Sequence, residues 1–443
     1  MGRVSNAFAA LAGRPSPASV PTTEKGYAAP SNPLGGWWSD TFEDTPELKW
    51  PKSVETYDKM RRQDAQVKSV LKAITLPILA TDWYIDPNGA DAQVAAFVAH
   101  EVGLRVRGDM GVDEELMSRA KDRFSMPDHL RLALTMLPFG HSLFEQVYRY
   151  GDEDGLFHLR KLAWRPPWTI RKFNVATDGG LISIQQRPAV GVQDTPEIPV
   201  DRLVVYVNER EGGRWEGQSA IRPAYKDWIL KDLLLRVQTQ SAERNGMGVV
   251  VYKGAEIPDL GDQAEMVSMQ QKDITQGLEI ATSVRSGESA GAAIPNSAEL
   301  ELKGVDGDLP DMDAPIRYHD EQIARSVLAH FLNLGQQTGS WALGSTFADF
   351  FSQSLQGVAV AVADVFTAHV IEDLVDVNFG KDVPAPRLAF DAIGAKHVPT
   401  AQEIAALVKT GVLWKGPALE NYVRTMYDIP AEKSIPDEGT TDE

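Results

Sequence analysis

The sequence predicts an α+β fold in which two long helices flank a small α/β insert. Three patterns predict it. Short apolar runs separated by Gly, Pro and Asp turns between residues 141 and 206 indicate β-strands. After residue 219, apolar residues recur at steps of three and four, which indicates long helices. A strand–helix–strand pattern over residues 247–313 separates two of these helices.

The first ordered element is predicted to be a helix that begins near residue 54 and ends before Pro77. Its buried stripe consists of Tyr57, Met60, Asp64, Val67, Leu71 and Ile74. Residues 1–53 are expected to form an irregular arm, because they are rich in Pro, Gly, Ser and Thr. The apolar run at residues 83–85 predicts a strand, which the turn at residues 86–89 closes.

Short helices and then strands follow. The helices are predicted at about 91–103, 112–123 and 127–137. The strands are predicted at 141–150, 156–164, 168–173, 181–186 and 203–206. Four tryptophans are interpreted as core residues rather than as a platform for stacked bases: Trp164, Trp168, Trp215 and Trp228.

Long helices dominate the second half of the chain. They are predicted from Ser219 to about Asn245, at 315–333 and at 345–377. The insert between the first two is predicted to contain a strand at 249–253, a helix at 262–279 and strands near 292–294 and 300–302. A strand at 387–390, helices at about 400–410 and 416–426, and a disordered acidic tail at 431–443 are expected to complete the chain.

The composition is that of an ordinary globular protein, with 43% hydrophobic and 24% charged residues among 443. No run reaches the roughly 18 to 20 apolar residues that a membrane span needs. The best candidate, residues 357–371, is interrupted by Asp364 and His369. No convincing secretion signal begins the chain, so synthesis in the cytoplasm is expected. The absence of cysteine excludes disulfides and thiolate metal sites.

The net charge disfavours a sequence-specific DNA-binding protein. Acidic residues outnumber basic ones by 62 to 44, which gives a formal charge of -18. Tight wrapping on phosphates depends on Lys and Arg that displace counterions. The acidic surplus suits a surface past which DNA moves without adhering, although many acidic globular proteins share it.

No catalytic or metal-binding constellation emerges from the sequence. There is no Gly-rich loop ending in Gly-Lys-Ser/Thr, so an internal ATPase is not expected. The dipeptide His100-Glu101 begins like a zinc-protease helix, but Leu104 stands where the second His would be. Four aspartates lie between residues 306 and 313, but their spacing does not fit a calcium loop. Glu145 and Glu243-Arg244 are candidate catalytic carboxylates, but Glu243-Arg244, at a helix end, is better explained by surface or packing contacts. We expect no cofactor, no metal and no enzymatic activity.

A polar loop with glycines at both ends, residues 335–340, interrupts otherwise strong helix. Its uncharged side chains are suited to weak contacts with a phosphate backbone, without any reading of base sequence. They belong to Gln336, Gln337, Thr338 and Ser340. A plain connection between helices is the alternative interpretation.

Six short motifs occur along the chain in a distinctive order. They are Tyr57-x-x-Met60-x-x-x-Asp64-x-x-Val67, Trp83-x-Ile85, Gly140-x-Ser142-x-x-Glu145, Gly217-x-Ser219-x-Ile221-Arg222, Trp228-x-x-Lys231 and Glu243-Arg244-x-Gly246. In this order and spacing, residues 54–390 resemble the portal proteins of tailed bacteriophages, specifically the Mu-like portal family. The chain departs from the family pattern at Gly248, where a proline is common.

The resemblance implies a portal fold with named parts. These are a wing at 54–217, a first stem helix at 218–246, a clip at 247–313, a second stem helix at 314–333, a tunnel loop at 334–345, a long helix returning to the wing at 346–398 and a helical crown at 399–430. Within this fold, the insert between two long helices corresponds to the clip.

The resemblance also implies a function in the virion. Portal proteins form a ring of about twelve copies at one capsid vertex, through which double-stranded DNA is packaged and ejected. The implied partners are DNA without sequence specificity, the terminase large subunit, a head–tail adaptor, and the major capsid and scaffold proteins. No membrane is involved. Two alternatives remain open, a minor capsid or head-completion protein and a nucleic-acid enzyme.

The resemblance assigns DNA-facing residues to the tunnel loop and the second stem helix. In the loop they are Gln336, Gln337, Thr338, Ser340 and Trp341. On the helix, Arg317 and Arg325 are expected either to attract phosphates or to bridge neighbouring subunits.

Overall fold

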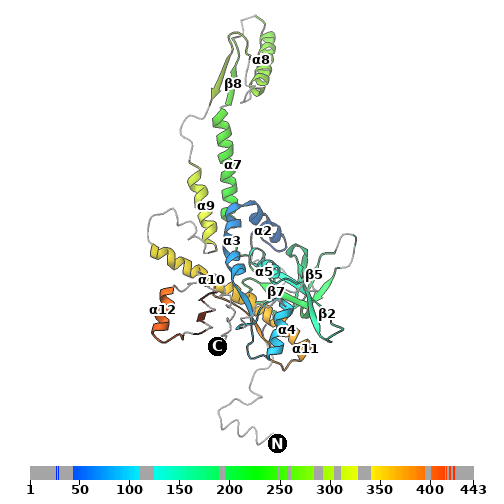
Figure 1. Cartoon of the computed structure of the whole chain (residues 1–443). Helices are drawn as coiled ribbons and strands as arrows, with labels where there is room; N and C mark the ends of the chain where they lie inside the picture. Colours follow the sequence, from blue (N-terminus) through cyan, green and yellow to red (C-terminus); the bar gives the residue numbers. More distant parts are fainter. Residues whose placement is uncertain are drawn as a thin grey trace, which may run out of the picture. The chain divides into compact units, whose positions relative to one another are not determined.

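The structure of the chain is a computed structural model (Figure 1). The structure describes residues 43–108, 124–188, 195–247, 249–256, 261–283, 293–303, 311–327, 341–394 and 401–414, together with residues 26, 28, 191, 416, 419, 420, 423 and 424. Helices and strands mix along the chain, which confirms the α+β prediction. The chain divides into two units, Met1–Phe390 and Asp391–Glu443. None of the described helices is both long and apolar enough to cross a membrane.

Two helices stand where the sequence predicts one. α2 (Lys52–Gln63) and α3 (Ala65–Ala80) meet at Asp64, whose extended backbone, φ -103° and ψ 124°, ends the first helix and begins the second. The predicted end before Pro77 was also wrong. The buried face of α3 continues past the proline to Ile78, and this packing offsets the roughly 3 kcal/mol that a proline inside a helix costs.

The next elements are shorter. β1 (Trp83–Asp86) and α4 (Ala92–Val102) lie where they are predicted. The helix predicted at 127–137 is split into α5 (Met126–Ala133) and α6 (Met136–Phe139). The helix predicted at 112–123 lies outside the described residues.

Two three-stranded antiparallel sheets follow, with strand orders β3-β2-β7 and β4-β5-β6. The strands are β2 (His141–Tyr150), β3 (Phe157–Arg165), β4 (Ile170–Val175), β5 (Leu181–Gln186), β6 (Glu197–Pro199) and β7 (Leu203–Val207). All but β6 were predicted; this strand is too short to show an alternation. Apolar side chains of the two sheets, among them Leu143 and Ile184, form one core cluster.

Trp168 is not the core residue that the sequence predicts. Two prolines, Pro166 and Pro167, impose a 3-10 turn at Pro167–Thr169, and β4 begins only after it. On this turn the Trp168 side chain is 43% exposed.

A small module follows the long helix α7 (Tyr225–Met247), which begins after Pro223 rather than at the predicted Ser219. The module comprises β8 (Val249–Lys253), α8 (Gln263–Ser283) and β9 (Glu299–Lys303). β8 and β9 pair antiparallel, and α8 packs on β8. Described residues 293 and 294 form no strand, so the prediction of a strand near 292–294 was wrong there. α9 (Asp313–Arg325) comes next.

The longest predicted helix consists of three consecutive segments. They are α10 (Trp341–Phe366), a π-helical turn (Thr367–Ile371) and α11 (Glu372–Phe379). A π-helical turn widens the helix and rotates the buried stripe that follows it. β10 (Arg387–Phe390) then pairs antiparallel with β1, so segments some 300 residues apart in the sequence share one ladder.

The second unit contains α12 (Ala401–Lys409), at the place where a helix is predicted at 400–410. Ile404 on this helix is buried. The helix predicted at 416–426 is described only at residues 416, 419, 420, 423 and 424, and the tail at 431–443 lies outside the described residues.

Candidate functional site

The candidate site is the pair of helices α7 and α9 and the point where they join the rest of the first unit (Figure 1). α9 turns the buried side chains of Ile316 and Ile323 inward. A polar contact joins the two helices, because Nδ1 of His319 lies 2.8 Å from Oδ1 of Asp227. The two helices therefore form a specific pair.

A buried lysine joins three elements at the base of this pair. Nζ of Lys231, on α7, lies 2.8 Å from Oδ2 of Asp64 and donates a hydrogen bond of 2.6 Å to Oδ1 of Asp320 on α9. Burial alone would lower the pKa of Lys231, but the hydrogen bonds to the two carboxylates raise it above its usual value. Lys231 thus stays charged and ties α7 both to α9 and to the α2–α3 turn.

Asp64 has two roles in this network. Its Oδ1 atom accepts hydrogen bonds from the backbone N–H groups of Gln66 and Val67, at 2.8 and 3.0 Å, and so caps the first turn of α3. Its other oxygen binds Lys231. The residue that breaks the predicted helix is therefore also the one that anchors α7.

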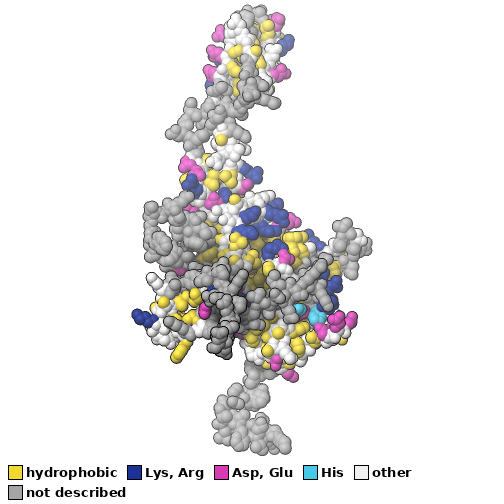
Figure 2. Space-filling view, in the orientation of Figure 1, with side chains coloured by type: hydrophobic (Ala, Val, Ile, Leu, Met, Phe, Trp, Pro, Cys, Tyr) yellow, Lys and Arg dark blue, Asp and Glu magenta, His cyan; other side chains and the backbone are white. Residues whose placement is uncertain are grey.

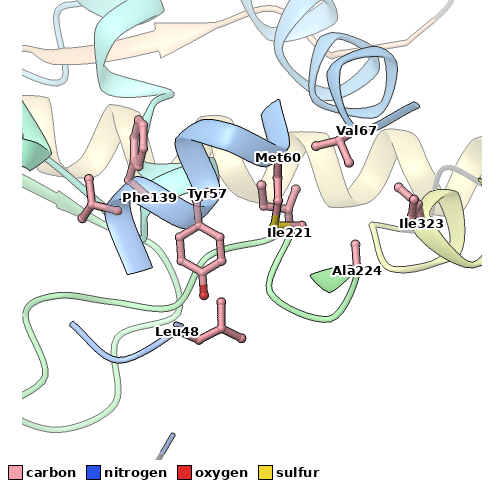
Figure 3. Packing of buried hydrophobic residues seen from close by; sticks show 9 residues of the cluster. Leu48, Tyr57, Met60, Val67, Phe139, Ile221, Ala224 and Ile323 are labelled. Atoms are coloured by element: carbon pink, nitrogen blue, oxygen red, sulfur yellow. The ribbon is translucent and has the colours of Figure 1, made fainter. Parts of the chain in front are cut away.

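A cluster of buried apolar side chains lies at the start of α7 (Figure 3). Tyr57 and Met60 come from α2, and Val67 comes from α3. They meet Ile221, from the turn before α7, and Ile323 from α9. A single cluster thus joins the start of α7 to three other helices.

Two glycines allow the turn before α7 to approach α6 closely. Gly140 and Gly217 have φ angles of +88° and +62°. A Cβ atom on Gly217 would lie 2.2 Å from the carbonyl oxygen of Gly140, which no side chain can accommodate. Beside them, the hydroxyl of Ser219 donates a 2.7 Å hydrogen bond to the carbonyl of Pro138. Glycine is therefore required at both positions.

An ion pair attaches the segment before α2 to the same turn. Arg222 donates two hydrogen bonds, of 2.8 and 2.9 Å, to the two oxygens of Glu43. Burial alone would raise the pKa of Glu43, but the hydrogen bond and the charge of Arg222 lower it below its usual value. The pair therefore remains ionised at neutral pH.

Two aliphatic side chains on the opposite face of α7 are exposed among polar ones. Ile229 and Leu233 are 41% and 55% exposed. At about 100° per residue they lie on the opposite side of the helix from Lys231. α7 thus turns a charged residue toward its own subunit and aliphatic side chains toward solvent.

The structure places some of the predicted DNA-facing residues. Arg317 and Arg325 lie exposed on α9, but each forms an ion pair one turn back, with Asp313 at 2.7 Å and with Glu321 at 3.6 Å. These carboxylates offset the two positive charges locally. Trp341 is the first residue of α10. The other loop residues, Gln336, Gln337, Thr338 and Ser340, lie outside the described residues.

The described part of the chain contains no group of three His, Asp or Glu side chains arranged to hold a metal ion. Glu145, one of the candidate catalytic carboxylates, forms ion pairs with Arg165 and, at 2.8 Å, with Arg202. Both partners neutralise it. The Lys231 network is the feature that sequence reasoning missed: Asp64 and Lys231 stand in separate motifs, and Asp320 lies in none.

Residues 54–429 match the family described as the portal protein of Mu bacteriophage. The chain belongs to this family. Its function is that of a portal protein of the virion. The match extends beyond residue 390, where the resemblance in the motifs ended, and it includes every residue of the Lys231 network.

The chain is also similar in fold to several solved structures. The chain is similar to one in the virion of a native gene transfer agent particle, with a TM-score of 0.50, 10% identity, and coverage of 86% of this chain and 95% of that chain. It is equally similar to one in the neck of the native particle computed with C12 symmetry, again with a TM-score of 0.50, 10% identity and the same coverage. A portal protein of an HK97-family phage from Corynebacterium diphtheriae has a TM-score of 0.42 and 13% identity, over 76% of this chain and 96% of that chain.

Proposed function

We propose that about twelve copies of this chain form a closed ring whose channel carries double-stranded DNA into and out of the capsid. Membership of a portal family supports a channel role. The neck structure of similar fold was computed with C12 symmetry, which supports the subunit number.

The exposure of Ile229 and Leu233 on α7 is the observation that carries this proposal. A surface helix normally turns its aliphatic side chains inward and its charges outward. α7 does the reverse at Lys231 and Leu233. A neighbouring copy that covers Ile229 and Leu233 would remove them from water, and a contact of this kind between unlike faces closes into a ring.

The proposed parts of the ring follow the boundaries expected from the sequence. Residues 54–217 form the wing, α7 and α9 the stem, and the module of β8, α8 and β9 the clip. The clip docks the terminase and later the head–tail adaptor, while the wing contacts the capsid and scaffold proteins. Residues 334–345 form the tunnel loop, and residues 399–430 the crown.

The charge of the ring fits passive guidance of DNA. At -18 per chain, about twelve copies carry on the order of -200 charges, which discourages DNA from adhering. Uncharged loop side chains then touch the phosphates without holding them. An external motor supplies the energy.

The test is the mass of the purified protein by light scattering, with negative-stain images. A ring of about twelve 48.6 kDa chains weighs about 0.6 MDa. Leu233→Glu should reduce this to the mass of monomers or small oligomers, because it places a charge in the proposed contact. Ile182→Glu, at an equally exposed position of β5, should leave the ring intact.

A stable monomer of the unaltered chain, even alongside capsid and scaffold proteins, would refute the ring. It would favour the minor capsid or head-completion function instead. Intact rings of Leu233→Glu would show that α7 is not the contact.

A further inference from the structure

The outer faces of α2 and α3 carry a basic surface, which Figure 2 shows as dark blue side chains gathered where these two helices lie. Residues 52–80 contain six Lys or Arg and three Asp or Glu, in a chain whose net charge is -18. The exposed basic side chains, here called the basic surface, are Lys52, Lys59, Arg62, Lys68 and Lys72.

Within the part of the chain that the structure describes, three of these five side chains form no ion pair. Among the described residues, no carboxylate forms an ion pair with Lys59, Lys68 or Lys72. The nearby carboxylate of Asp64 is turned inward to Lys231. This contrasts with α9, where Arg317 and its neighbours pair with one another.

The α3 part of the basic surface has a regular geometry. Lys68, Lys72 and Leu76 are spaced four residues apart, which places them on one face of the helix along about 12 Å. All three are exposed, Leu76 by 53%. No acidic residue occurs between residues 65 and 80. The row is therefore two positive charges followed by one apolar side chain.

We infer that this row docks an acidic segment of a partner protein, which places two carboxylates against Lys68 and Lys72 and an apolar side chain against Leu76. A protein segment fits better than DNA for two reasons. A phosphate backbone offers no apolar group to cover Leu76. The acidic surplus of the whole chain also opposes the approach of a long polyanion more than that of a short segment.

The inference deepens the proposed function and rests on it in one respect, since a portal has protein partners in the virion. It assigns a surface and a charge to one such contact, on α3 and outside the module of β8, α8 and β9. It requires no closed ring.

The experiment measures the binding of two fluorescent probes to the full-length protein by anisotropy at low salt. One probe is a 20-residue helical peptide that carries Glu, Glu and Leu one turn apart, and the other is a 20-base-pair DNA duplex of mixed sequence. The variants are Lys68→Glu/Lys72→Glu and Leu76→Ala. Lys272→Glu/Lys409→Glu, which reverses two exposed lysines elsewhere, is the matched control.

We expect the peptide to bind the unaltered protein, and Lys68→Glu/Lys72→Glu to weaken it about tenfold or more. Leu76→Ala should weaken it about threefold, while the control double variant leaves the affinity unchanged. Peptide binding that is absent, or equally weakened by the control, would overturn the inference. So would tighter binding of the duplex that depends on the two lysines and not on Leu76.

Light scattering on the same samples separates this inference from the proposed ring. Peptide binding by a protein that stays monomeric would support the docking surface and contradict the ring. Rings of normal mass that do not bind the peptide would support the ring and contradict the docking surface.

Discussion

Replacing Lys231 with methionine tests whether the buried ion network holds α7 in place. Lys231→Met keeps the length of the side chain and removes its charge. Asp64 and Asp320 then face each other without a cation between them. The α7–α9 pair should loosen, because two carboxylates remain at the base of α7 with no compensating charge.

The magnitude follows from the burial of the three side chains. Removing one partner of a buried ion pair costs about 3 to 5 kcal/mol. The side chains of Lys231 and Asp64 are 9% and 7% exposed, but that of Asp320 is 32% exposed, so water screens its half of the network. The lower end, about 3 kcal/mol, is therefore expected, which corresponds to roughly a hundredfold change in a local opening equilibrium.

The assay is amide hydrogen exchange of the full-length protein, followed by mass spectrometry on peptides from α7 and α9. Exchange there should accelerate by roughly a hundredfold in Lys231→Met. Arg236→Met is the matched control, since Arg236 lies on the same helix and forms a 2.9 Å ion pair with Asp232 in which both side chains are exposed. The control should change exchange by less than about threefold. Equal rates in the two variants would refute the argument that the buried network fixes α7.

Three further predictions concern the turn, the core and the loop. Gly217→Ala should destabilise the protein by more than about 3 kcal/mol in thermal melts, because its Cβ would meet a backbone oxygen. The control is Gly411→Ala, where φ is +76° and no atom lies within 4 Å of the added Cβ, and it should cost only about 1 kcal/mol. Burial lowers the pKa of His141 from 6.5 to about 4. Unfolding therefore takes up a proton between these pH values, stability falls as the pH drops through this window, and His141→Leu should flatten that dependence; an unchanged slope of melting temperature against pH would contradict it. Replacing residues 336–340 with glycine and serine should leave the ring mass unchanged and lower the amount of packaged DNA, and normal packaging would exclude a special role for the loop.

Hydrophobic periodicity located most of the elements, but it could not locate the break at Asp64. The apolar stripe of α2 and α3 keeps its step of three and four residues across that position, so the period alone predicts one helix. The break comes from the two functions of the Asp64 carboxylate, which caps α3 and binds Lys231. An aspartate at a helix start is visible in a sequence, but its distant cation is not.

Trp168 is a second position that the sequence patterns did not predict correctly, because a residue expected in the core is exposed. Its large aromatic ring and its place at the start of a predicted strand favour burial. The adjacent Pro166 and Pro167 form a turn that ends the strand pattern and exposes the ring. The prolines were a usable signal. A proline disfavours helical backbone at the residue before it, and it cannot donate a hydrogen bond within a β-sheet.

Four of the six motifs that carry the family resemblance converge on the base of α7. Asp64 and Lys231 form one ion network, Gly140 and Gly217 form one close backbone contact, and Arg222 binds the segment before α2. Motifs far apart in the sequence thus fix one quantity, the direction in which α7 leaves the body of the subunit.

That direction matters more in a ring than in a monomer. A ring of about twelve copies closes only if each copy is turned by about 30° relative to the last, so a small error at the base of α7 is repeated at every contact. In the proposed ring, Leu233 would affect whether neighbours adhere, whereas Lys231 would affect the angle at which they meet. Loss of rings in Leu233→Glu, together with rings of mixed size in Lys231→Met, would separate these two roles.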